Sequence, residues 1–175
     1  GRLIASTGES GLVFIDTSNM QIDHDYEYTF GRDVDWAEYL WFEGPIRVIS
    51  QDMDGNLWLG TDQNGIFKVP HDQINNWFTN RANYKYDKNR PDGLSSSTIT
   101  CISQDQTGGT WIGTNNGLNK YQKETDSFIH YFVDHGLPSN YITAIVPDDK
   151  NNLWISSKKG ISLFDQTDTT FTNYG

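Results

Sequence analysis

The chain has 175 residues, enough for one domain with a sizeable core, and its 14% aromatic content indicates that it folds. Its 23 acidic residues outnumber its 13 basic ones, for a formal net charge of -10. Like-charge repulsion therefore excludes nucleic acid and anionic membrane surfaces as expected partners, and no apolar stretch approaches the roughly 20 residues of a membrane span.

A repeat runs along the chain, and its first copy begins part-way through. Residues 3–7 predict a strand, and comparison with the later copies puts Ile4 at a position where those copies have tryptophan. The strand that precedes this position in the other copies is missing here. We therefore expect a partial first unit over residues 2–30.

Three fuller copies follow, and each has an aspartate six residues before a tryptophan. The pairs are Asp52 with Trp58, Asp105 with Trp111, and Asp148 with Trp154. The tryptophans lie 53 and 43 residues apart, which suits the period of a propeller blade. Their recurrence favours core packing between blades over ligand stacking, and the aspartates, including the one in the calcium-like segment 52–56, are expected to cap turns.

Short runs rich in β-branched and aromatic residues, bounded by Asp, Asn and Gly, predict four strands in each full copy. In the last copy we expect strands at residues 142–147, 153–157, 161–165 and 171–174. The chain is thus predicted to be an all-β β-propeller fragment, an open arc cut from a longer ring. After the partial first blade it holds three full four-stranded blades, at residues 46–86, 99–131 and 142–174.

The pattern Ile-x-x-Asp-x-x-Gly-x-Leu-Trp-Ile-Gly-Thr-x-x-Gly-Leu, followed by Phe-x-x-Tyr and Gly-Leu-Pro-Ser-Asn, resembles the two-component regulator propeller repeat. The likeness is fullest over residues 94–174, whereas residues 93–97 and 41–45 depart from the usual junction. This resemblance implies a periplasmic sensor region of a hybrid histidine kinase of the Bacteroides type, with a glycan as its signal. It implies that any kinase activity lies elsewhere in the full-length protein.

Loops that join successive blades share one face of a propeller with the turns between second and third strands, and ligands usually sit there. On that face the insertion at residues 31–44 mixes aromatic and charged side chains, which suits stacking and hydrogen bonding to a sugar. The same aromatics could instead cap the arc or pack on a neighbour. The candidate ligand-binding residues are Arg32, Asp33, Trp36, Tyr39, Trp41, Asn115 and Asn140.

Other site chemistries have little support in the sequence. His24, His71, His130 and His135 lack metal-ligand spacing, Cys101 lies in an apolar run typical of a buried thiol, and no cofactor motif or catalytic constellation is present. An open arc exposes blade faces, so we expect self-association, and an oligosaccharide is the expected ligand. The alternatives are a structural or dimerisation scaffold without a ligand, or a propeller lyase or glycoside hydrolase.

Overall fold

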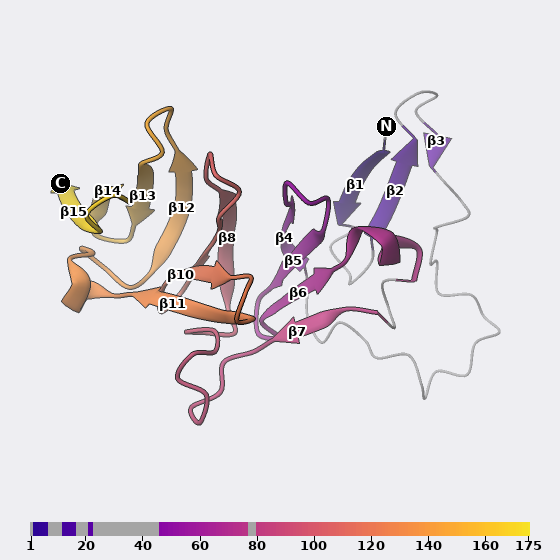
Figure 1. The fold of residues 1–175 in the computed structure, drawn as a ribbon, viewed down its shortest axis with the longest axis horizontal. Helices are drawn as coiled ribbons and strands as arrows, with labels where there is room; N and C mark the ends of the chain where they lie inside the picture. The colour runs from indigo at the N-terminus through magenta and orange to yellow at the C-terminus, as the bar shows by residue number, and fades with distance from the viewer. Residues whose placement is uncertain (1, 7–11, 17–20, 23–45, 77–79) are drawn as a thin grey trace.

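The computed structural model describes residues 2–6, 12–16, 21–22, 46–76 and 80–175. These residues form four antiparallel sheets that stand in a row, from β1–β3 at one end to β12–β15 at the other (Figure 1). Within each sheet the strands are ordered as in the sequence, so every strand pairs with the one that follows it. The prediction of an all-β chain with three four-stranded units after a smaller first unit is confirmed.

The strand bounds agree with those expected from the sequence to within one residue in the last unit. The first sheet contains β1 (Arg2–Ser6), β2 (Leu12–Asp16) and β3 (Gln21–Ile22). The second contains β4 (Ile46–Gln51), β5 (Leu57–Thr61), β6 (Ile66–Val69) and β7 (Ala82–Tyr84). The third contains β8 (Ile99–Gln104), β9 (Thr110–Thr114), β10 (Gly117–Gln122) and β11 (Ser127–Tyr131). The fourth contains β12 (Ile142–Pro147), β13 (Leu153–Ser157), β14 (Gly160–Asp165) and β15 (Thr170–Tyr174).

Two short 3-10 helices, which the sequence did not predict, accompany these strands in the described part of the chain. They are η2 (His71–Asn76), after β6, and η3 (Val133–His135), after β11. No helix among the described residues has the length and apolarity needed to span a membrane.

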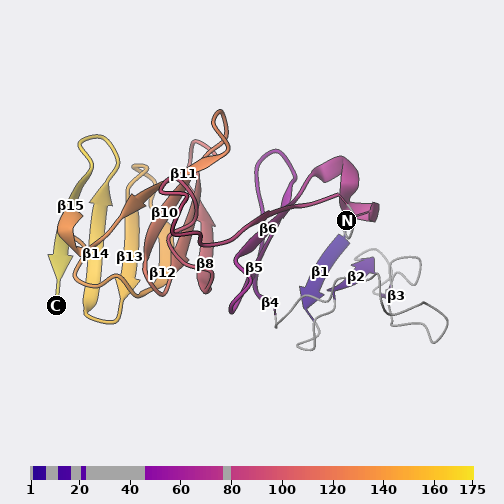
Figure 2. The same ribbon diagram turned by 90° about the horizontal axis from the view of Figure 1, so that it is seen from below.

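The sheets converge at their first strands. Strand β8 contacts both β4 and β12, and each of these three is the first strand of its sheet. Strands β5 and β9, which are second strands, contact the first strand of the sheet that follows, and β1 contacts β4 in the same way. Figure 2 shows the same row of sheets from below.

A hydrophobic cluster of the same design fills each space between neighbouring four-stranded sheets. One cluster consists of Trp58, Ile66, Tyr84, Leu94, Ile99, Ile112 and Phe128, with Val48, Ile102 and Tyr121 at its margin. The next consists of Trp111, Leu118, Leu137, Ile142, Ile145, Leu153, Ile155 and Phe164, with Cys101, Tyr131 and Phe171 at its margin. Burying this much apolar surface between layers is the main force that holds the sheets together.

The three repeated tryptophans do not share one environment. Trp58 and Trp111 are fully buried between sheets, as predicted, and each makes edge-on ring contacts with an aromatic residue of the following sheet. Trp154 is 40% exposed, so the prediction of core packing is wrong for this residue. The physical reason is that no sheet of the described chain packs on the outer face of β12–β15.

Candidate functional site

In the described part of the chain, the loops before β8 and β12 lie on the same face as the β9–β10 and β13–β14 turns, and we call this the loop face. The backbone N–H of Asn115, in the β9–β10 turn, donates to the carbonyl of Thr98, in the loop before β8. In the following sheet Lys158 donates in the same way to Tyr141, in the loop before β12. These contacts bring together the two classes of loop that the sequence placed at one ligand-binding face.

Asn115 and Asn140, two of the predicted ligand-binding residues, are both on the loop face. Asn115 is exposed, and its Oδ1 accepts a 2.6 Å hydrogen bond from the hydroxyl of Ser96. Asn140 is half-buried; its Oδ1 accepts from the backbone of Val133, and its Nδ2 lies 3.5 Å from Oδ1 of Asn116. Asn140 therefore contacts Asn116, the chain neighbour of the other predicted residue, Asn115.

The other predicted ligand-binding residues, Arg32, Asp33, Trp36, Tyr39 and Trp41, lie outside the described residues. The structure adds two pairs on the loop face that sequence reasoning missed. The ammonium group of Lys158 lies 3.8 Å from the ring centroid of Tyr141, and the guanidinium of Arg47 pairs with Asp62 at 2.8 Å. The two residues of each pair are 15 or more positions apart in the sequence, and no strand or helix periodicity predicts a contact at that separation. Only the fold reveals these contacts.

Buried polar side chains fix the loop before β8. Asn119 is fully buried in β10; its Oδ1 accepts from the backbone N–H of Ser95, and its Nδ2 donates to the carbonyl of Ile112. On the same loop the carbonyl of Gly93 accepts a 2.6 Å hydrogen bond from Nε2 of His130. These hydrogen bonds give the loop a defined geometry.

The opposite face, which we call the turn face, carries the repeated aspartates. Oδ1 of Asp105 accepts hydrogen bonds from Thr107 and Gly109, and its Oδ2 accepts from the indole of Trp111. Burial opposes ionisation of Asp105, but these hydrogen bonds outweigh it and keep the pKa of its carboxyl below the ordinary value. Asp52 accepts from Asn56 and Trp58 in the same manner, so the predicted turn-capping role is confirmed.

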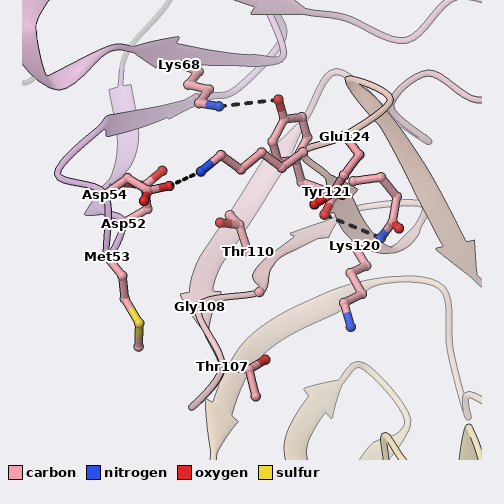
Figure 3. Close-up of a pocket in the computed structure, with 13 residues that line it drawn as sticks. Asp52, Met53, Asp54, Lys68, Thr107, Gly108, Thr110, Lys120, Tyr121 and Glu124 are labelled. Carbon is pink, nitrogen blue, oxygen red and sulfur yellow. Dashed lines mark hydrogen bonds and ion pairs between the residues drawn. The ribbon is translucent and has the colours of Figure 1, made fainter.

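A cavity of about 400 Å³ opens on the turn face between the second and third sheets (Figure 3). Lys123, which follows β10 in the third sheet, forms a 2.6 Å ion pair with Asp54 of the second, and this pair lowers the pKa of the Asp54 carboxyl. Lys68 extends from the other wall to the hydroxyl of Tyr121. The cavity is lined by three lysines and three carboxylates, namely Lys68, Lys120, Lys123, Asp52, Asp54 and Glu124. This charge-balanced lining differs from the mainly apolar lining of small-molecule pockets, and its contacts link the two sheets.

No group of three or more His, Cys, Asp or Glu side chains suited to a metal ion occurs in the described part of the chain. Cys101 packs at the margin of the cluster around Trp111, where burial raises the pKa of its thiol to about 11. A thiol of this pKa is almost entirely protonated at neutral pH and is a poor nucleophile. Cys101 thus acts as the small apolar residue that the sequence indicated.

Residues 40–63, 93–116 and 136–159 match the sequence profile of the family described as two component regulator propeller. The second and third matched segments each cover the loop before a sheet, its first two strands and the turn after them, and the first covers β4 and β5. These three segments are two-component regulator propeller repeats. The predicted resemblance is therefore confirmed. No curated protein sequence matches the chain significantly.

Solved structures with the same fold support the propeller architecture of the regulator repeats. The extracellular domains of two hybrid two-component systems of B. thetaiotaomicron superpose with TM-scores of 0.75 and 0.73, at 18% and 20% identity, covering 100% and 99% of this chain. An auxiliary nutrient binding protein from Bacteroides ovatus superposes with a TM-score of 0.61 at 12% identity, over 99% of this chain and 38% of its own. This chain spans 23% of the length of each of the first two structures.

Proposed function

We propose that this chain is a ligand-binding segment of a propeller in the extracytoplasmic, periplasmic sensor region of a two-component system. The observation that carries the proposal is the match of three segments to two-component regulator propeller repeats. The extracellular domains of two hybrid two-component systems have the same fold, which supports this placement. In this view the full-length protein contains a histidine kinase, and this segment is not itself catalytic.

The ligand class that we propose is an oligosaccharide bound at the loop face. Amide groups of Asn115, Asn116 and Asn140 offer donors and acceptors together, which suits sugar hydroxyls. Tyr141 adds an aromatic ring beside the cationic Lys158. Ligand contact here would act on loops that are anchored to the sheets through Asn119, which offers a route from binding to blade packing.

A glycan array probed with the purified chain, followed by calorimetry on each sugar that binds, tests this function. Asn115→Ala should weaken binding about fivefold or more, because one or two hydrogen bonds are lost. Gln122→Ala, on the turn face, is the matched control and should leave the affinity unchanged. An equal effect of the two substitutions would argue against the loop face, and release of cleaved sugar would favour the lyase or hydrolase alternative.

A scaffold function is the second candidate, and one observation favours it. Three apolar residues of the fourth sheet, Trp154, Ile161 and Tyr174, are 40%, 47% and 49% exposed. Their counterparts in the third sheet, Trp111, Leu118 and Tyr131, pack in the cluster between sheets. An exposed face of this kind is suited to association with another propeller surface. A chain that binds no sugar but forms dimers would support the scaffold.

A further inference from the structure

The first strand of every four-stranded sheet contains a β-bulge at the same place. Pairing with the second strand shifts register between Ile46 and Val48 in β4, and between Ile99 and Cys101 in β8. The same shift occurs between Ile142 and Ala144 in β12. The extra residues are Arg47, Thr100 and Thr143, which we call the bulge triad. Bulges that recur at one position re-aim a side chain and are common beside functional sites.

The bulge changes which side of the sheet each residue faces. Ile99 and Ile102, three residues apart, both pack in the cluster around Trp58, whereas Cys101 packs in the cluster around Trp111. In a regular strand, residues two apart share a face and residues three apart do not. Thr100 lies where this alternation is interrupted, and it belongs to neither cluster.

The bulge triad lies on the strands at which the sheets converge. Strands β4, β8 and β12 each pair with only one strand of their own sheet, so each has a free edge, and β8 contacts both of the others. Each triad residue is the second residue of its strand and is therefore close to the loop face. Arg47 and Thr143 are exposed and Thr100 is half-buried.

We propose that Arg47, Thr100 and Thr143 form a polar arc that binds a neutral saccharide at the axial end of the loop face. This inference rests on the proposed function and identifies the residues that would set its specificity. The guanidinium of Arg47 donates to Asp62, and the Thr143 hydroxyl contacts the hydroxyl of Ser156. These contacts hold the side chains of Arg47 and Thr143 in place. The remaining guanidinium donors and the threonine hydroxyls suit vicinal sugar hydroxyls. Because Asp62 neutralises Arg47, the arc offers hydrogen bonds without net positive charge.

Calorimetry on the full chain tests this arc with the neutral probes maltohexaose, cellohexaose, xylohexaose and mannohexaose, and with an acidic chondroitin hexasaccharide. The variants are Arg47→Lys, which keeps the charge, and Thr100→Val and Thr143→Val, which keep the shape. Each should raise the Kd of the neutral probe that binds by about fivefold or more, as expected for a lost hydrogen bond. Thr125→Val, on the turn face, is the matched control and should change nothing, and thermal melts verify that every variant folds.

The outcomes separate the arc from the proposed function. If Asn115→Ala weakens binding and none of the three triad variants does, the arc is overturned and the loop-face function stands. If the acidic probe binds more tightly than every neutral one, the assignment of a neutral saccharide is overturned. If the wild-type chain binds none of the probes, both proposals are overturned for these sugars.

Discussion

The indole N–H of Trp111 donates a 2.9 Å hydrogen bond to Oδ2 of Asp105. Trp58 donates to Asp52 at the same distance, so this relationship is part of the repeat. The aspartate caps a turn with one oxygen and holds the tryptophan of the next strand with the other. The spacing of six residues thus couples a turn to the packing between sheets.

Asp105→Ala should destabilise the chain by about 2–3 kcal/mol, because Trp111 and the backbone of Gly109 lose their acceptor inside the protein. Urea unfolding followed by tryptophan fluorescence measures the change. Asp148→Ala is the matched control: the described structure has no hydrogen bond between Asp148 and the exposed Trp154. Asp148→Ala should lower the free energy of unfolding clearly less than Asp105→Ala does. Equal losses in the two variants would show that the hydrogen bond to the indole contributes nothing to stability.

Acid should weaken the fold partly through Asp105. Its folded pKa lies below the ordinary value, because hydrogen bonds from Thr107, Trp111 and Gly109 outweigh the effect of burial. The unfolded chain therefore takes up a proton first, so the stabilisation is complete above about pH 4 and declines as pH falls through the folded pKa. Urea midpoints at about pH 6 and about pH 3 should differ less in Asp105→Asn than in the wild type.

Alkali should weaken the contact between the second and third sheets. The hydroxyls of Tyr84 and Tyr121 both donate to Oδ1 of Asp126, at 2.6 and 2.7 Å. Burial, with the nearby Asp126 carboxylate, raises the pKa of Tyr121 to about 12. Because the pKa of Tyr121 is higher in the folded chain than in the unfolded one, its contribution to stability is complete below the unfolded pKa of about 10. The contribution is lost as the pH rises from there through the folded pKa of about 12. Tyr121→Phe should flatten the decline of the melting temperature over this range, and an unchanged slope would contradict the assignment.

Gly60 should not tolerate a side chain. A Cβ built there would lie 2.6 Å from methyl groups of both Val48 and Ile99, the latter in the neighbouring sheet. Gly60→Ala should therefore cost about 1–3 kcal/mol from overpacking. The equivalent position in the fourth sheet is occupied by Ser156, which no following sheet of the described chain covers. Ser156→Ala, measured by the same urea titration, should have little effect; a comparable loss would remove the steric explanation.

The exposed face of the fourth sheet should drive self-association. Trp154→Lys places a charge among Ile161 and Tyr174 and should shift the chain toward monomer in sedimentation velocity, with little change in melting temperature. Val133→Ser is the control, because Val133 is 48% exposed but lies in η3 and not in the fourth sheet. A wild-type chain that stays monomeric over a wide concentration range would rule out association through this face.

The sequence predicted which residues lie on the loop face but not the contacts that they make there. The sequence placed Asn115 and Asn140 on one face, because both follow from where loops fall in a repeated unit. It gave no indication of the Arg47–Asp62 pair or of the contact between Lys158 and Tyr141. Sequence reasoning also missed the bulge triad, although the Ile-x-x-Ile spacing in all three first strands departs from the alternation of a regular strand.

The sequence by itself determined the repeat, the strands and the capped turns, because these depend on neighbours a few residues apart. Asp105 and Trp111 are six residues apart, and that spacing alone predicts a turn followed by a strand. Only the tertiary structure decided that Trp111 is buried while Trp154 is exposed. Burial depends on whether another sheet lies alongside, and the similar local sequences around Trp111 and Trp154 carry no information about that layer.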